Sequence, residues 1–400
     1  MLMQSPGKKL ALLGSLCLFL SAIEYIIPKP LPFMRIGLAN LPLLIAVGIY
    51  GFKDFFLLAF LKVLGQGIIG GTFFSYIFLF SVAGTFSSAM VMYALQNLFT
   101  KKYIGFIGLG CAGAMVSNIV QLLLARYLIF GDALRYLMPP FLASGFVTGV
   151  ALGIACDYFC RHSKWYAGDA SILQPKPENP EALPKETIQK GNFRLKRNRL
   201  WNDFFSSGSL FFSGLVMALV FLFARTLENR IVLFLFFLLL FWFSGKKFNL
   251  LITLSIMSLT VIFNLLVPYG RLLFVIGPLR ITEGSLFAGI EKALTLGSLI
   301  LLSRACINID LRLPGKIGFL LGESFRMLEI FRQKKGYIRR GKIIAGIDRV
   351  LSEVEAEAEA VGKHEEHKKK KLNYISLIVL GIIITAAAFL AFIPIYTPKF

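Results

Sequence analysis

The sequence predicts an all-α membrane protein whose chain crosses the bilayer several times. Of its 400 residues, 56% are hydrophobic and only 16% are charged. The mean hydropathy is +0.71, and the apolar residues come in long runs. So few charges cannot cover a water-soluble fold with this much apolar surface. The composition therefore excludes a soluble enzyme, a secreted disulfide scaffold and a disordered protein.

Six apolar runs in the first part of the chain predict a six-helix bundle over residues 1–162. Each run has about the length that a bilayer core requires. Lys8 and Lys9 precede the first run, but no small-residue cleavage pattern follows. We therefore expect this run to stay in the chain as a membrane helix rather than to be removed as a signal peptide. The runs cover residues 10–27, 36–50, 54–70, 73–99, 103–129 and 137–160.

Glycines recur at short intervals in this first part of the chain. Small residues let membrane helices approach one another closely, so the glycines predict a compact bundle. The alternative is that glycine is simply frequent in membrane helices. The glycines are Gly65, Gly67, Gly70, Gly71, Gly105, Gly108, Gly110 and Gly113.

Residues 163–203 have the composition of a linker, because several prolines stand among mixed charges. Residues 204–400 then hold apolar runs that predict roughly five further membrane helices. The last of these runs follows a long polar region, residues 304–371. The five runs cover residues 204–224, 231–243, 248–267, 284–303 and 373–393.

Two apolar stripes at helical spacing interrupt the polar region 304–371. They predict amphipathic helices that lie on the membrane or against a partner. The first stripe is Leu320, Leu321, Phe325, Leu328 and Phe331. The second stripe is Ile343, Ile344, Ile347, Val350, Leu351 and Val354.

The distribution of basic residues predicts the orientation of the chain. With the N-terminus in the cytoplasm, the loops around Lys53, Lys101 and Lys246, the linker and residues 304–371 all fall on the inner side, as the positive-inside rule requires. We therefore expect a multi-pass protein of the cell (cytoplasmic) membrane. The net charge of +21 then reflects these loops and attraction to anionic lipid. Nucleic acid is not an expected partner, because basic and aromatic residues do not interleave.

The motifs of several enzyme classes are missing from the sequence. Gly245-Lys246-Lys247 lacks the first glycine and the Ser/Thr of a phosphate-binding loop. No acidic D-D-x-x-D cluster is present to hold magnesium on a diphosphate. Cys156 and Cys160 share a helical face but have no His or Asp partners nearby in the sequence. We therefore expect no enzyme activity, no cofactor and no metal site.

Polar residues inside the predicted helices of the first bundle are the candidate binding residues. Charged groups in hydrocarbon are costly and usually face a cavity or one another. They predict a pocket for a polar small molecule. The alternative is a structural ion pair, or snorkelling of Glu24 at the membrane interface. The candidates are Glu24, Asn40, Lys62, Gln66, Asn118 and Gln121.

Residues 9–160 resemble the Gx transporter family, which is also labelled heptaprenyl diphosphate synthase component I. Proteins of this family look like the substrate-binding components of energy-coupling-factor transporters. The synthase label does not fit the missing acidic motif. The matching stretches are Glu24 with Pro28-Lys29-Pro30-Leu31-Pro32, Ile36-Gly37-Leu38-Ala39-Asn40, Leu61-Lys62-Val63-Leu64-Gly65, Gly70-Gly71-Thr72-Phe73-Phe74-Ser75 and Phe80-Ser81-Val82-Ala83-Gly84.

Residues 204–400 resemble the transmembrane coupling component of the same transporters. The resemblance rests on Ile281-Thr282-Glu283-Gly284 at the start of a helix that ends at Arg304, on the amphipathic helices and on the last span. In that family, two Ala-Arg-Gly-type motifs contact the ATPases. Here the first position reads Gln333-Lys334-Lys335-Gly336, and the second reads Ala360-Val361-Gly362 without an arginine. Lysine lacks the planar guanidinium fork. The resemblance implies ATPase contacts at Lys334, Lys335, Gly336 and Arg304.

Together the two resemblances imply an importer for a vitamin-like or other small organic molecule. The chain would fuse the substrate-binding and coupling components, and ABC-type ATPase subunits would bind in trans. The alternative is a non-enzymatic membrane scaffold linked to isoprenoid or quinone metabolism or to membrane redox assembly. An ion-driven carrier is disfavoured, because the chain has neither an internal repeat nor an acidic relay inside the membrane.

Overall fold

The computed structural model describes residues 6–26, 37–99, 104–167, 201–224, 226–246, 250–277, 279–308, 311, 315–334, 343–361 and 374–393. These residues are almost entirely helical. Among them, five helical stretches are long and apolar enough to cross a membrane. The prediction of an all-α, multi-pass membrane protein is therefore confirmed. The five stretches are Tyr76–Leu98, Phe106–His162, Leu227–Ser244, Glu283–Cys306 and Tyr374–Phe392.

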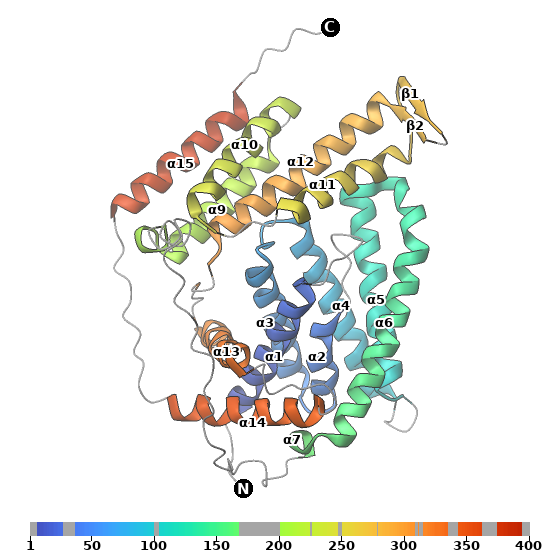
Figure 1. Ribbon diagram of the computed structural model, residues 1–400, viewed down its shortest axis with the longest axis vertical. Helices are drawn as coiled ribbons and strands as arrows, with labels where there is room; N and C mark the ends of the chain where they lie inside the picture. Colours follow the sequence, from blue (N-terminus) through green and yellow to red (C-terminus); the bar gives the residue numbers. More distant parts are fainter. Residues whose placement is uncertain are drawn as a thin grey trace.

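The first part of the chain forms an upright helical bundle (Figure 1). A π-helical turn, η2, and a short 3-10 turn, η3, join the two long helices α5 and α6. The elements in order are α1 (Pro6–Ile26), η1 (Leu38–Asn40), α2 (Leu41–Ala46), α3 (Phe52–Gly70), α4 (Tyr76–Leu98), α5 (Phe106–Ala125), η2 (Arg126–Phe130), η3 (Gly131–Ala133), α6 (Leu134–His162) and α7 (Lys164–Ala167).

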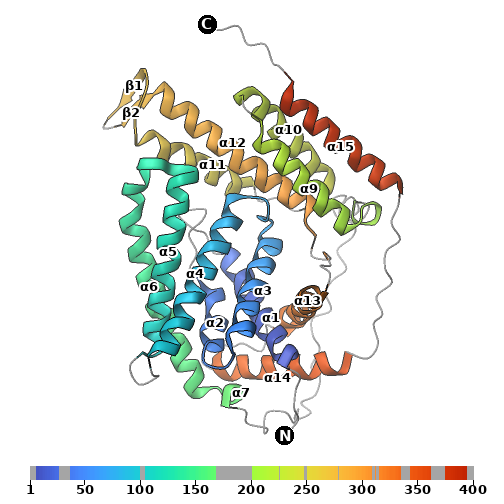
Figure 2. The same cartoon turned by 180° about the vertical axis from the view of Figure 1, so that it is seen from behind.

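The second part of the chain supplies a layer of inclined helices and two further helices at the foot of the bundle. In both views α12 and α15 cross the direction of α5 and α6 at a steep angle (Figures 1 and 2). The elements in order are α9 (Ser207–Leu222), α10 (Leu227–Ser244), α11 (Leu250–Leu265), β1 (Leu272–Ile276), β2 (Leu279–Thr282), α12 (Glu283–Cys306), α13 (Gly315–Lys334), α14 (Ile343–Val361) and α15 (Tyr374–Phe392).

The second predicted helix, residues 36–50, is much shorter than expected. Gly37 has a left-handed backbone with a φ of 85°, and Pro42 lies in the first turn of α2. Both residues favour the start of a new helix at this place. The six residues of α2 rise by only about 9 Å, so α2 does not cross a bilayer. This part of the prediction was wrong.

The β-hairpin between α11 and α12 was not expected either. Strands β1 and β2 pair antiparallel, with Val275 opposite Arg280. Gly277, close to the turn, has a φ of 57°, which glycine adopts readily. The sequence predicts only a connection between two membrane helices here. A hairpin this short gives no clear alternation of apolar and polar residues.

Glycines bring α5 and α6 into close contact. A Cβ atom at Gly110 would lie 2.7 Å from the carbonyl oxygen of Gly149. A Cβ atom at Gly153 would lie 2.8 Å from the carbonyl oxygen of Phe106. Both distances are too short for a side chain, so the two backbones meet only because these positions are glycine. The predicted close packing is therefore observed at Gly110.

The turn between α3 and α4 joins the bundle to the inclined helices. The side chain of Phe74 lies against Gly214 of α9, where a Cβ atom would be 2.6 Å from the ring. The backbone N–H of Phe74 donates to Ser303 Oγ of α12 at 3.4 Å. The ring of Phe211 packs on Phe73 and Phe74, with centroid distances of 5.2 and 5.6 Å. The stretch Gly70-Gly71-Thr72-Phe73-Phe74-Ser75, which carries part of the first family resemblance, therefore contacts α9 and α12 of the second part.

Helix α13 packs along α1, at the foot of the bundle (Figure 1). Ser324 Oγ lies 3.1 Å from the carbonyl oxygen of Ala11, and a Cβ atom at Gly14 would be 2.7 Å from the same Oγ. Leu321 and Phe331 of the predicted apolar stripe are buried in the core shared with α1. The amphipathic helix therefore has a partner within its own chain.

Candidate functional site

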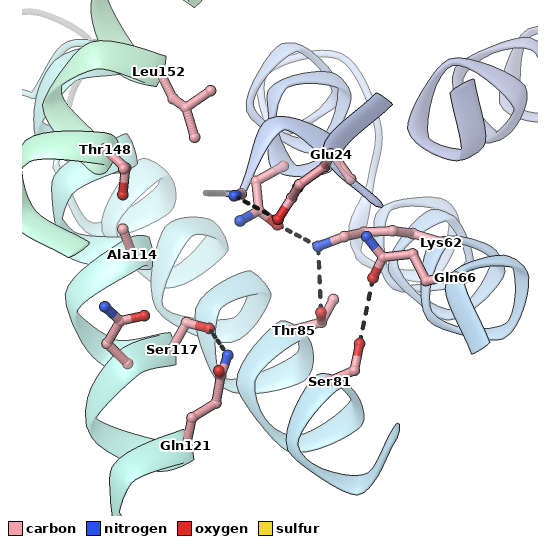
Figure 3. A pocket seen from close by; sticks show the side chains of 14 residues that line it. Glu24, Lys62, Gln66, Ser81, Thr85, Ala114, Ser117, Gln121, Thr148 and Leu152 are labelled. Atoms are coloured by element: carbon pink, nitrogen blue, oxygen red, sulfur yellow. Dashed lines mark hydrogen bonds between the residues drawn. The ribbon is translucent and has the colours of Figure 1, made fainter. Parts of the chain in front are cut away.

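All six candidate binding residues line one cavity inside the bundle (Figure 3). The cavity has about 490 Å³ of space not occupied by atoms, counted out to its open mouth. Residues from α1, η1, α3, α4, α5 and α6 contribute to its walls. The lining residues are Glu24, Gly37, Ala39, Asn40, Lys62, Gln66, Ser81, Thr85, Ala114, Ser117, Asn118, Gln121, Thr148 and Leu152.

Two charged side chains belong to one wall of this cavity. Lys62 on α3 and Glu24 on α1 are each only 3% exposed. The ammonium group of Lys62 donates to Asn40 Oδ1 and, at 3.3 Å, to Thr85 Oγ1. Glu24 Oε1 accepts the backbone N–H of Gly37 at 3.2 Å. Gly37 precedes the first helical turn of η1, whose N–H groups favour a nearby negative charge.

Gln66 links α3 to both neighbouring helices on the same wall. Its Nε2 atom donates to Ser21 Oγ of α1 at 2.8 Å. Its Oε1 atom accepts a hydrogen bond from Ser81 Oγ of α4 at 3.3 Å. Lys62 and Gln66 are one helical turn apart, so both reach the cavity from the same face of α3.

The opposite wall, from α5 and α6, carries only neutral side chains. Gln121 Nε2 donates to Ser117 Oγ at 2.9 Å, so their amide and hydroxyl groups form a polar patch (Figure 3). Asn118 Nδ2 donates to the carbonyl oxygen of Phe141 at 3.0 Å. This bond ties α5 to α6 beside Gly145. Asn118 therefore has a structural role in addition to its place in the cavity wall.

The sequence analysis missed four hydroxyl groups of the cavity. Ser81 and Thr85 are four residues apart on α4. Ser117 lies four residues before Gln121 on α5, and Thr148 faces them from α6. The four-residue spacing to a carboxamide or to a second hydroxyl is the signal that could have identified three of them. Single hydroxyls in membrane helices carry little signal, because they bond to the helix backbone.

The predicted ATPase contacts are only partly within the described residues. Arg304 at the end of α12 packs on Gly71 of the bundle, where a Cβ atom would be 2.6 Å from Arg304 Cγ. Lys334 is the last residue of α13. Lys335 and Gly336 lie outside the described residues. A role of these residues in ATPase binding stays a prediction.

A second group of polar contacts fixes α14 to the end of the bundle. Asp348 of α14 is 5% exposed, and its carboxylate accepts hydrogen bonds from Ser163 Oγ at 2.5 Å and from the backbone N–H of Lys164 at 2.9 Å. Trp165 Nε1 donates to Glu355 Oε2 at 3.3 Å. We call Asp348 and its two partners the α14 anchor. It attaches the second part of the chain directly to the end of α6.

The cavity has the chemistry of a binding site for a small polar molecule. Its walls offer a carboxylate, an ammonium group, carboxamides and hydroxyls in a largely buried setting. Such convergent polar groups in a concave site fix the orientation of a ligand. Among the described residues, no three His, Cys, Asp or Glu side chains are grouped to hold a metal ion.

Comparison with known families matches the two parts of the chain separately. Residues 13–159 are similar to a family described as heptaprenyl diphosphate synthase component I, which agrees with the first resemblance. Residues 210–309 are similar to a domain of unknown function, DUF8519, which gives no support to a coupling component. No curated protein and no solved structure matches the chain.

Proposed function

We propose that this membrane protein is a subunit of an energy-coupling-factor-type importer for a vitamin-like or other small organic molecule. The first part would bind the substrate and the second part would transmit movement from ATPase subunits that bind in trans. The observation that carries this proposal is that α13 and α14 pack on the bundle that contains the polar cavity. Movement of these two helices would therefore move the bundle directly.

The contacts between the two parts extend along the inclined helices of the second part. Gly71, in the turn between α3 and α4, packs on Arg304 at the end of α12. At the other end of the contact, Phe130 packs on Phe263, near the predicted outer end of α11, with a centroid distance of 5.8 Å. One side of the bundle thus extends along the length of α11 and α12.

These contacts suit a substrate carrier whose bundle changes its tilt against the inclined helices. ATP-driven movement of α13 and α14 would change this tilt through the Ser324–Ala11 contact and the α14 anchor. The change of tilt would carry the cavity from the outer to the inner side.

Depletion of compounds from the growth medium tests this proposal. Cells that produce the protein are compared by untargeted mass spectrometry with cells that produce Lys62→Ala at equal level. The control is Lys53→Ala, because Lys53 is exposed on the same helix. We expect one small organic compound to be depleted by wild-type and Lys53→Ala cells but not by Lys62→Ala cells. Equal depletion of every compound by all three would contradict import.

The similarity of residues 13–159 to heptaprenyl diphosphate synthase component I favours a second candidate function. A membrane scaffold for isoprenoid or quinone metabolism, or for redox assembly, would also carry that description. Such a scaffold needs protein partners but no transported ligand. It predicts that Lys62→Ala leaves the medium unchanged and that isoprenoid or redox enzymes accompany the purified protein.

A further inference from the structure

The β-hairpin between α11 and α12 projects beyond the ends of these two helices (Figures 1 and 2). Phe274 and Val275 of β1 pair with successive residues of β2, so their side chains point to opposite faces of the strand. The two side chains are 51% and 54% exposed, and the preceding Leu272 and Leu273 are 52% and 46% exposed. Both faces of β1 are therefore apolar, and the described part of the chain leaves both about half uncovered.

The hairpin is joined directly to a helix that can cross the membrane. Strand β2 ends at Thr282, and α12 begins at the next residue, Glu283. The backbone N–H of Glu283 donates to the carbonyl oxygen of Arg271 at 2.8 Å, which fixes the base of the hairpin to the start of α12. The 24 residues of α12 rise by about 36 Å, compared with about 30 Å for the hydrocarbon core of a bilayer. When α12 crosses the bilayer, the hairpin therefore lies at one of the two membrane surfaces.

The charges of the hairpin complement a surface of lipid phosphates. Residues 270–282 contain two charged residues, Arg271 and Arg280, and both are basic and exposed. Arg271 directly precedes β1, and Arg280 lies opposite Val275. Arginine binds phosphate through two parallel hydrogen bonds, while its apolar stem packs on hydrophobic surface. The exposed Glu283 stands in the first turn of α12, where the helix dipole favours a negative charge.

The backbone of the hairpin limits how deeply it enters the membrane. Within the described residues the sheet has only two strands, so each strand has one edge without a strand partner. Backbone N–H and C=O groups without partners are costly in hydrocarbon. In the headgroup layer, water and lipid oxygens satisfy these groups while apolar side chains reach the upper part of the acyl chains. The hairpin therefore suits the membrane interface rather than the bilayer core.

We propose that this hairpin binds the headgroup layer of the membrane, with a preference for anionic lipids. Lipids surround both faces of a projecting strand, whereas a protein partner would have to enclose the strand from two sides. Such binding would hold the adjoining ends of α11 and α12 at the membrane surface. It does not depend on import, because a membrane scaffold would use the same surface. The surface consists of Arg271, Leu272, Leu273, Phe274, Val275 and Arg280.

Fluorescence quenching in nanodiscs that each hold one full-length chain tests the depth of the hairpin. The variant Phe274→Trp adds one indole to the three tryptophans of the chain, so the difference from wild type reports this position. The quenchers are lipids brominated either just below the headgroup or near the end of the acyl chain. We expect the shallow bromines to quench the added indole more strongly. The control is Ile382→Trp, near the middle of α15 and 62% exposed, which the deep bromines should quench more strongly.

A second variant, Val275→Trp, places the indole on the opposite face of β1. It should show the same shallow quenching, and it replaces Phe274→Trp if thermal unfolding shows that the latter fails to fold. Stronger quenching by the deep bromines would overturn the interfacial position. Absence of quenching by either lipid would overturn lipid binding. Access of aqueous acrylamide would then leave the hairpin in water, and protection only in discs with two chains would assign the surface to a second copy.

The double variant Arg271→Gln/Arg280→Gln, made together with Phe274→Trp, tests the lipid preference. Discs of phosphatidylcholine are compared with discs that also contain anionic phosphatidylglycerol. With both arginines present, we expect more shallow quenching in the anionic discs, and the double variant should lose this difference. The control is Arg332→Gln, an exposed arginine of α13, which should keep it. An equal difference in the double variant would overturn the preference for anionic lipids.

Discussion

The two parts of this chain use polar side chains inside the helical packing in different ways. In the bundle, Lys62 and Glu24 face a cavity. In the inclined helices, Lys246 and Arg230 instead bind neighbouring helices. Lys246 Nζ donates to three carbonyl oxygens at the end of α12, those of Arg304 at 2.9 Å, Ala305 at 3.2 Å and Ile307 at 2.7 Å. Arg230 Nη1 contacts Glu291 Oε1 at 3.1 Å and Thr295 Oγ1 at 2.8 Å.

The two parts also differ in the side chains that pack between their helices. Helices α5 and α6 meet through glycines, which brings their backbones together, and Gly145 leaves room for the side chain of Asn118. The core of the inclined helices is instead filled by large side chains such as Phe221 and Phe237, both fully buried. Asn229 Nδ2 also ties α10 to the last helix by donating to the carbonyl oxygen of Ala391 at 2.7 Å. The bundle thus encloses a polar cavity, whereas the inclined helices form a cross-linked frame.

A side chain at Gly153 should have the largest effect. Gly153→Leu would separate α5 from α6, because even a Cβ atom meets the backbone of Phe106. Overpacking of this kind costs about 1–3 kcal/mol or more. The matched control is Gly381→Leu on α15, where the space around the Cβ position is open. We expect Gly153→Leu to lower the unfolding temperature and the yield of purified protein, and Gly381→Leu to leave both unchanged. Equal effects would show that glycine contacts do not hold the bundle together.

Loss of the Lys246 ammonium group should destabilise the frame without affecting the cavity. Lys246→Met leaves three carbonyl oxygens without this donor, at a cost of about 3 kcal/mol. Lys316→Met serves as the control, because Lys316 is exposed on α13. The unfolding temperature should be lower in Lys246→Met and unchanged in Lys316→Met. Cells that produce Lys246→Met should still deplete the compound that wild-type cells deplete, at a temperature where the variant is folded. A loss of depletion would show that the frame and the cavity are not independent.

Loss of the α14 anchor should release α14 while the bundle stays folded. Asp348→Ala removes two hydrogen bonds to a carboxylate, at a cost of about 2 kcal/mol. We expect limited proteolysis to cut near α14 faster in this variant. The exposed Glu329 provides the control Glu329→Gln. Unchanged cleavage in Asp348→Ala would show that the remaining contacts of α14, with α1, α7 and α13, are sufficient to hold it in place.

The smallest expected effect is a pH dependence of the free energy of unfolding that arises from Lys246. Burial lowers the pKa of Lys246 from 10.5 to about 8. Between these values the unfolded chain keeps a proton that the folded chain has lost, so the free energy of unfolding should rise with pH across this range. Thermal unfolding of wild type and Lys246→Met at both ends of the range measures the difference. The rise should be smaller in Lys246→Met, and an equal rise in both would assign it to other groups.

Much of the fold follows from hydrophobic run length, but two segments do not. The run 36–50 is apolar enough to be read as one helix, and only the left-handed Gly37 and the position of Pro42 reveal a short α2. The β-hairpin is too short for a periodic signal. In the cavity, the six carboxamide and charged residues could be found because such groups are costly in hydrocarbon. The contact of Gly71 with Arg304 could not be predicted, because it depends on the tilt between the two parts.

The central claim is that the second part couples the bundle to ATPase subunits in trans. The most direct test is purification of the tagged protein from its native host in mild detergent, followed by mass spectrometry of the accompanying proteins. We expect a pair of ABC-type ATPases in stoichiometric amount, bound through the region that contains Lys334, Lys335 and Gly336. Absence of any ATPase even after cross-linking, with isoprenoid or redox enzymes in its place, would contradict the importer and favour the scaffold.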